Sequence, residues 1–128
     1  MEKILIIGGG QAGFSCAAKL RASGFEGAIS IACEEKFFPY QRPPLSKKYL
    51  TGQYELKRLL LRSEEYYKKN NIEVLLSAKV SEIKKEKKEV FFNFGKARNY
   101  TKLVLSTGSR AAKIFPKESN NCKNIYYL

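Results

Sequence analysis

The chain has 128 residues, of which 44% are apolar and 12% aromatic, so it can form one domain with a core and is too apolar for a disordered segment. Its formal net charge of +12 comes from 24 lysine and arginine residues against 12 acids. Such an excess can attract nucleic acid, anionic lipid or an acidic protein. The basic residues are scattered, and an acid interrupts even the densest run, at residues 84–88. A solvated lysine-rich surface is therefore favoured over a nucleic-acid site, which needs a basic stripe with stacking aromatics.

The cysteines and the first apolar run indicate the compartment. Cys16, Cys33 and Cys122 lie far apart and form no CxxC motif of a metal or redox site. An odd number of cysteines without a signal peptide predicts reduced thiols in the cytoplasm. The apolar run at residues 4–7 is too short for a signal peptide or a membrane-spanning helix, so no membrane association is expected.

The first third of the chain predicts a strand–helix–strand unit. Residues 3–7 are nearly all apolar, which is typical of a strand buried on both faces of a parallel sheet. Residues 11–23 have helical spacing, and Gly24 is expected to end the helix. Residues 28–32 are rich in isoleucine and predict the second strand. The small-residue face expected to pack on the sheet consists of Ala12, Gly13, Cys16, Ala17 and Leu20.

A glycine-rich turn joins the first predicted strand to the helix. It contains G-x-G-x-x-G at Gly8, Gly10 and Gly13. In a dinucleotide site the first glycine permits the tight turn, the second admits the pyrophosphate, and the third lets the helix pack closely on the strand. The N–H groups at the start of the helix then face the phosphates.

An acid about 20 residues after the glycines completes this fingerprint, because it binds a ribose hydroxyl. Glu34 lies at that distance, at the end of the second predicted strand, and Glu35 is its neighbour. The alternative is a glycine turn in an α/β protein that binds no nucleotide. The agreement of strand, glycines, helix, strand and acid favours the nucleotide site.

The rest of the chain predicts shorter elements. A proline-rich loop leads to a helix over residues 45–50 that begins at Pro44, and Ser63 is expected to cap a second helix that ends at residues 70–71. Strands are expected at residues 72–74, 79–83, 89–94 and 102–105, the middle two as a hairpin, and another strand begins at residues 125–128. The strand at residues 3–7 is expected to lie between those at 28–32 and 102–105.

Residues 39–47, with the sequence P-Y-Q-R-P-P-L-S-K, resemble the P-Y-x-R-P-P-L-S-K signature of the ferredoxin/rubredoxin reductase family. Residues 106–108, S-T-G, are similar to the A-T-G of that family, and the resemblance covers essentially the whole chain. It implies an α/β fold, namely a truncated Rossmann-like FAD-binding domain with a parallel sheet and a small antiparallel β-meander. Residues 1–110 would be the N-terminal segment of that domain, and residues 111–128 a connector toward an NAD(P)H-binding domain.

The resemblance also implies an FAD site. The pyrophosphate would lie against the glycine turn, the ribose against Glu34 with Glu35 as a neighbouring cofactor-binding candidate, and Arg42 would reach the adenine-side phosphate or ring. The remaining implied contacts are Gln11, Ala12 and Gly13 at the pyrophosphate, the backbone of Val80 at the adenine, and Thr107 and Gly108 along the cofactor.

Lys47 would lie beside the isoalloxazine ring, and it is the candidate catalytic residue because a fixed cation stabilises a reduced, anionic flavin. A cation at Arg42 likewise suits a diphosphate. Without the signature, Arg42 and Lys47 would be interpreted as a solvated surface pair. No metal site is expected.

The function implied by the resemblance is that of an NAD(P)H-dependent flavoprotein passing electrons to a ferredoxin- or rubredoxin-type acceptor. A nucleotide-binding fragment without turnover of its own is the alternative, and a second glycine fingerprint downstream would distinguish the two. Related disulfide reductases carry a C-x4-C pair after the second strand, where this chain has Cys33 alone, so dithiol chemistry is not expected.

Overall fold

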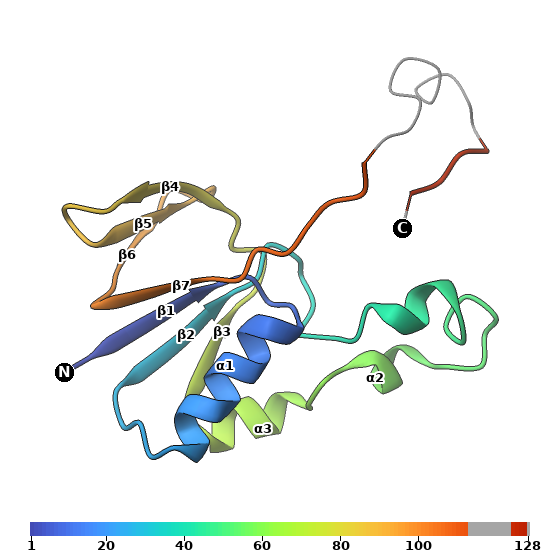
Figure 1. Ribbon diagram of the computed structural model, residues 1–128, viewed down its shortest axis with the longest axis horizontal. Coiled ribbons are helices and arrows are strands. Elements are labelled where there is room, and N and C mark those ends of the chain that lie inside the picture. Colours follow the sequence, from blue (N-terminus) through green and yellow to red (C-terminus); the bar gives the residue numbers. More distant parts are fainter. Residues whose placement is uncertain (113–123, 128) are drawn as a thin grey trace.

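The structure is a computed structural model that describes residues 1–112 and 124–127. Its centre is a four-stranded parallel sheet in the order β3-β2-β1-β7 (Figure 1). The strands are β1 (Lys3–Ile7), β2 (Ala28–Ala32), β3 (Ile72–Leu75) and β7 (Lys102–Leu105). β1 pairs in parallel with β2 on one side and with β7 on the other, so the predicted central position of β1 is confirmed.

The apolar run of β1 is explained by cores on both faces of the sheet, since successive side chains of a strand point to opposite faces. Ile4 and Ile6 pack with residues of the helical layer, which include Phe14 and Tyr67. Leu5 and Ile7 pack on the other face, against residues of the small antiparallel sheet. The side chains at positions 4–7 are at most 7% exposed.

Helix α1 (Gln11–Ala22) follows the glycine turn, and Gly24, with a φ of +80°, lies just past its end. The expected buried face is partly wrong. Ala12 is exposed, while Phe14, which was not expected there, is buried together with Gly13 and Ala17. The close approach of Gly13 to the turn fixes the rotation of the helix, which leaves Ala12 on the open side.

Arg21, in the last turn of α1, binds two other turns through its guanidinium group. It donates to the carbonyl oxygens of Phe25 and Gly27 in the connection to β2, with N–O distances of 2.5 and 2.9 Å. It also donates to those of Asn70 and Asn71, before β3, at 2.8 and 2.7 Å. One side chain therefore joins the C-terminal end of α1 to the segments that start two neighbouring strands.

Residues 36–62 form a lobe beside the sheet, with a 3-10 helix η1 (Pro43–Ser46) and helix α2 (Leu56–Leu59), whereas helix α3 (Glu64–Lys69) packs beside α1 against the sheet (Figure 1). The predicted helix at 45–50 is wrong. The N–H of Lys47 bonds to the carbonyl of Pro44, the 3-10 pattern, and the φ of −131° and ψ of −112° at Lys47 end the helix. Ser63 is the N-cap residue of α3 as predicted, but its side chain makes no capping hydrogen bond.

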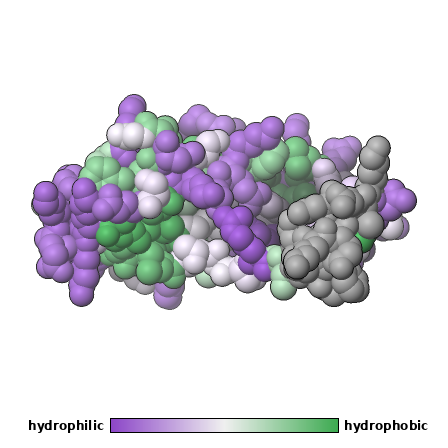
Figure 2. All heavy atoms as spheres, turned by 90° about the horizontal axis from the view of Figure 1, so that it is seen from above, coloured by the Kyte–Doolittle hydropathy of each residue, from purple (hydrophilic) through white to green (hydrophobic). Residues whose placement is uncertain are grey.

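The predicted meander is confirmed as a three-stranded antiparallel sheet of β4 (Val80–Lys84), β5 (Glu89–Phe92) and β6 (Ala97–Asn99). β5 ends two residues before its predicted end, in a turn where Gly95 has a φ of +77°. Figure 2 shows an apolar area on the half of the molecule where this sheet lies, and Ile83 and Phe94 are exposed in this region.

The C-terminal predictions fall largely outside the described residues. Residues 113–123, which include Cys122 and most of the expected connector, are not described, and neither is residue 128. The expected strand start is wrong for residues 125–127, which form no strand, because no strand among the described residues pairs with them. Within residues 1–112 and 124–127, no helix is long and apolar enough to span a bilayer.

A polar contact at the surface, reached by one buried hydroxyl, links the two sheets. Arg98 of β6 donates two hydrogen bonds to the carboxylate of Glu73 in β3, at 2.6 and 3.0 Å. The hydroxyl of Ser30, 8% exposed in β2, donates to the same carboxylate at 2.6 Å. Burial alone raises the pKa of Glu73, but the hydrogen bonds from Arg98 and Ser30 outweigh it and hold that pKa below its ordinary value.

This contact predicts a pH dependence. Because the pKa of Glu73 is depressed in the folded state, its contribution to stability is present above the unfolded carboxyl pKa of about 4.3 and is lost as pH falls through the folded value. Glu73→Gln should therefore lower the urea midpoint at pH 7, and the difference from the wild type should shrink below about pH 4. An equal difference at both pH values would contradict this assignment.

Candidate functional site

The candidate site lies at the carboxyl ends of the parallel strands, where α/β sheets bind ligands beside a change in strand order. The N–H of Gly8, just after β1, bonds to the carbonyl of Ala32 in β2 at 2.9 Å. The N–H of Ser106, just after β7, bonds to the carbonyl of Ile7 at 2.8 Å. The glycine turn is thus held between the ends of β2 and β7, and helix α1 begins directly above it.

Two glycines of the fingerprint are required by the protein's own packing. A Cβ at Gly8 would lie 2.1 Å from the carbonyl oxygen of Ser106, and Gly8 has a φ of +115°, which disfavours any side chain. A Cβ at Gly13 would lie 2.0 Å from the carbonyl oxygen of Gly8. Gly8 therefore permits the turn, and Gly13 permits α1 to pack closely against it.

Gly10 is different, because nothing in the protein requires a glycine there. It is the N-cap residue of α1, with a φ of −84° and a ψ of −169° that any residue can adopt. A Cβ at Gly10 would meet no atom within 4 Å. The next two residues, Gln11 and Ala12, are exposed, and the first turn of α1 contains no acid. The missing side chain thus leaves open space in front of the N–H groups of a helix start, which suits an anion.

Ser106 takes the place of the alanine in the resembled A-T-G motif, and it contributes contacts that an alanine lacks. Its hydroxyl donates to the carbonyl oxygens of Ile7 and Gly8, at 3.0 and 3.2 Å. The end of β7 is therefore attached to the glycine turn by a side chain as well as by the backbone.

Glu34 lies just past β2, exposed and paired with two cations. Nη2 of Arg110 lies 2.7 and 2.9 Å from its two carboxylate oxygens, and Nζ of Lys79 lies 3.4 Å away. The hydrogen bond from Arg110 lowers the pKa of Glu34, and the charges of Arg110 and Lys79 lower it further. Glu34 is therefore a carboxylate at neutral pH, able to accept hydrogen bonds from ribose hydroxyls.

Glu35 binds a different pair of residues. It accepts hydrogen bonds from the hydroxyl of Tyr40 at 2.7 Å and from the guanidinium of Arg42 at 2.9 Å. The guanidinium carbon of Arg42 lies 5.8 Å from the centre of the Tyr40 ring. Glu35 thus positions the arginine of the proline-rich signature beside the end of β2.

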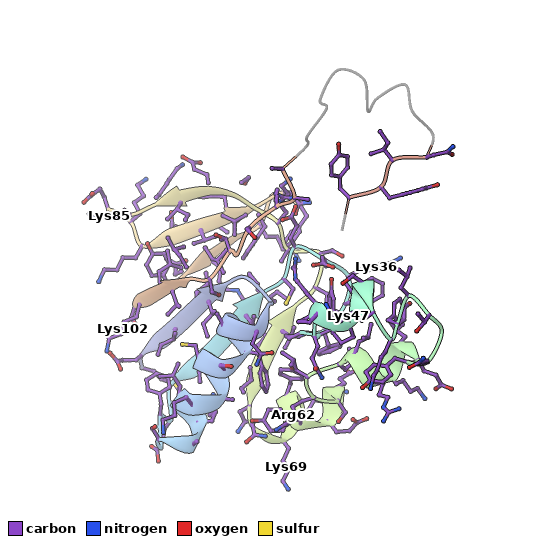
Figure 3. All side chains as sticks on the ribbon, turned by 45° about the vertical axis from the view of Figure 1, so that its right-hand side comes forward. Lys36, Lys47, Arg62, Lys69, Lys85 and Lys102 are labelled. Carbon is purple, nitrogen blue, oxygen red and sulfur yellow. The ribbon has the colours of Figure 1, made fainter. Side chains whose placement is uncertain are left out.

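The other candidates differ in how closely they join this group. Val80 is half-buried at the start of β4, and Thr107 and Gly108 are exposed just after β7, where Gly108 has a φ of +66°. Lys47 is exposed on the lobe (Figure 3), and among residues 1–112 and 124–127 its Nζ bonds only within its own turn, 3.5 Å from the carbonyl of Pro43 and 3.4 Å from the hydroxyl of Ser46. The candidates at strand ends therefore form one group, which Lys47 does not contact.

Sequence reasoning missed three residues of the candidate site: Lys79, Ser106 and Arg110. The last had a weak signal, since it follows the S-T-G motif by two residues. Nothing in the local pattern distinguished Lys79 from the other lysines, because its pairing with Glu34 depends on how β3 and β4 are joined.

The described cysteines are free thiols, Cys33 buried and Cys16 half-buried. Burial, together with the charge of Glu35, raises the pKa of the Cys33 thiol to about 11, so Cys33 is a poor nucleophile at neutral pH. Among the described residues, no group of three or more ligating side chains could hold a metal ion.

Comparison with known proteins identifies the family. The model of the pyridine nucleotide-disulphide oxidoreductase family matches residues 2–128. The chain belongs to this family. Its members use FAD and a pyridine nucleotide, which agrees with the expected cofactors.

Several of the similar proteins are named as reductases of a ferredoxin or a rubredoxin. Rhodocoxin reductase of Rhodococcus erythropolis is 38% identical over 98% of the chain, and the ferredoxin–NAD(+) reductase subunit of the benzene 1,2-dioxygenase system of Pseudomonas putida is 41% identical over 84%. The crystal structure of a covalent putidaredoxin reductase–putidaredoxin complex matches 88% of the chain with a TM-score of 0.85 and 37% identity. The chain spans only 29%, 26% and 27% of these three proteins. The similarity to this crystal structure confirms the Rossmann-like fold.

Proposed function

We propose that this chain is the FAD-binding portion of an NAD(P)H-dependent flavoprotein reductase that passes electrons to a ferredoxin- or rubredoxin-type acceptor. The open space at Gly10 carries the proposal, because the protein's own packing does not require glycine there while an approaching pyrophosphate does. The names of the similar proteins support the reaction and the class of acceptor.

The residues at the strand ends fit the adenosine diphosphate half of FAD. The N–H groups at residues 11–13 would bind the pyrophosphate, and the helix dipole would favour its negative charge. Glu34 would accept hydrogen bonds from the ribose hydroxyls. Arg42, held by Glu35, would supply a fixed cation near the phosphate or the adenine. The adenine and the rest of the cofactor would pass Val80, Thr107 and Gly108.

At the flavin end, the bound cofactor supplies the redox chemistry by accepting a hydride and releasing single electrons. The part that we assign to this chain is electrostatic. Lys47 is held near η1 by its weak contacts with the turn around Ser46, and it would place its ammonium group beside the ring. A cation there favours the reduced, anionic flavin over the neutral oxidised form.

The FAD assignment is tested at Gly10 in the whole protein that carries this chain. Gly10→Val should leave the fold intact, since the position faces open space and has an extended backbone, but should block the pyrophosphate. The variant should therefore purify without bound FAD, measured as absorbance near 450 nm relative to 280 nm, with an unchanged circular dichroism spectrum. A Gly10→Val protein with one FAD per chain would show that the assignment is wrong.

We further propose that the acceptor is acidic, because the net charge of +12 of this chain would steer such a partner. Figure 3 shows basic side chains on several sides of the molecule, with Lys36 and Lys47 on the lobe and Lys85 and Lys102 at the opposite end. The screening length falls from about 30 Å at 0.01 M salt to about 8 Å at 0.15 M. We therefore expect kcat/KM for an acidic ferredoxin to fall about tenfold over this range of salt concentration. Reduction of an uncharged dye is the control. If kcat/KM for ferredoxin does not change with salt concentration, the basic residues do not steer the acceptor and form only a solvated surface.

The second candidate is a nucleotide-binding fragment without turnover; the chain spans less than a third of each compared protein. A coding sequence that continues into a second glycine fingerprint supports the reductase. We also propose a cytoplasmic location, which agrees with the free thiols of Cys16 and Cys33.

A further inference from the structure

Gly9 occupies a variable position of the G-x-G-x-x-G pattern, yet the structure leaves no room for a side chain there. A Cβ at Gly9 would lie 2.3 Å from Sγ of Cys33 and 3.0 Å from its Cβ. Cys33 lies just after β2 and is 3% exposed. The buried sulfur is thus packed directly against the middle residue of the glycine turn.

The Cys33 side chain has little freedom to move away. Its N–H bonds to the carbonyl of Leu75 at 2.8 Å, and its carbonyl accepts from the N–H of Ala78 at 2.7 Å. Its side chain belongs to the same buried cluster as Phe14 and Tyr67. Since the backbone is bound on both sides and the neighbouring space is filled, a group added at Gly9 must displace the glycine turn instead.

We propose that Cys33 is a positioning residue for the pyrophosphate turn, and that its contact with Gly9 sets the distance between that turn and the bound diphosphate. The inference rests on the proposed FAD site. A Cβ at Gly9 would reach van der Waals contact with the sulfur only if the glycine turn moved by about 1 Å. Such a movement is enough to weaken the hydrogen bonds from the adjoining N–H groups to the proposed diphosphate. The thiol acts here through its size and not through its chemistry.

The test uses five variants of the whole protein that carries this chain: Gly9→Ala, Cys33→Ala, Gly9→Ala/Cys33→Ala, Gly10→Ala and Gly10→Ala/Cys33→Ala. FAD is removed, and its rebinding is followed by quenching of flavin fluorescence. The apo unfolding midpoint and the absorption spectrum of the bound flavin are measured in parallel. Gly10→Ala is the matched control, because its added methyl group would meet the proposed pyrophosphate but no protein atom.

Gly9→Ala should weaken FAD binding at least about tenfold, and the double variant should bind within about threefold of Cys33→Ala alone. Gly10→Ala should weaken binding without restoration by Cys33→Ala. If Gly9→Ala does not fold, recovery of folding and FAD binding in the double variant also supports the contact. Normal binding by Gly9→Ala, or a double variant as weak as Gly9→Ala, would overturn the inference.

A failure of the proposed function gives a different result. If the unmodified protein binds no FAD, the FAD site is wrong. The contact is then judged from the apo unfolding midpoint, which Gly9→Ala should lower in the normal background and leave nearly unchanged in the Cys33→Ala background. An equal lowering in both backgrounds would overturn the contact as well.

Discussion

Gly8→Ala should destabilise the protein by at least about 4 kcal/mol, enough to leave little folded protein in a marginally stable chain. The φ of +115° at Gly8 is unfavourable for any residue with a Cβ, and such strain costs about 1–3 kcal/mol. In addition, the new methyl group would lie 2.1 Å from the carbonyl oxygen of Ser106. Ser106 cannot move away easily, because its backbone N–H is hydrogen-bonded to the carbonyl of Ile7. Denaturant unfolding of the purified variant measures the loss.

Gly95→Ala separates strain from collision. Gly95 also has a positive φ, of +77°, but a Cβ there meets no atom within 4 Å. The control should therefore lose only about 1–2 kcal/mol. If Gly8→Ala and Gly95→Ala lose similar free energies of unfolding, the collision with Ser106 does not contribute, and backbone strain alone explains the glycine at position 8.

Arg21→Met should destabilise the protein by about 3 kcal/mol, which is more than a hundredfold in the ratio of folded to unfolded molecules. Its guanidinium donates to four carbonyls in two turns, and methionine keeps most of the aliphatic stem but leaves those oxygens without this donor. The turns before β2 and β3 should also become more mobile, visible as faster hydrogen exchange of the amides in residues 25–28 and 70–72.

The control for this substitution is Lys19→Met on the same helix. Lys19 is exposed, so its replacement should change stability by no more than about 0.5 kcal/mol. The loss of stability for Arg21→Lys should lie between those for Arg21→Met and Lys19→Met, because an ammonium group cannot reproduce the planar guanidinium that reaches two turns at once. A loss for Arg21→Met no larger than that for Lys19→Met would contradict the assigned role.

The elements that the sequence predicted well are those determined by local pattern. β1 is buried on both faces and is therefore apolar without alternation, and the glycine turn follows it directly. β6 (Ala97–Asn99) was not placed because three residues with one half-buried side chain show no period. The helix expected at 45–50 had suitable residues, but the turn at Lys47 overrode their propensity.

The site shows the same division. The placement of the fingerprint glycines between β1 and α1, and of Glu34 just past β2, was predictable because their spacing follows from the strand–helix–strand unit. The pairing of Glu34 with Arg110 joins residues 76 positions apart, and the contact of Gly9 with Cys33 depends on how β2 lies beside β1. Such contacts have no local signal, since they arise only when distant strands pair.

The attachment of Ser106 to the glycine turn has a consequence for the order of synthesis. Its hydrogen bonds to Ile7 and Gly8 connect residues 99 and 98 positions apart, so β1 and its turn leave the ribosome long before their partner does. Until β7 pairs with β1, the glycine turn is held only at the end of β2, and one edge of β1 has unpaired backbone groups. We therefore expect the turn to reach its final position only after β7 has paired, and the apolar edge of β1 to be exposed in the nascent chain until then.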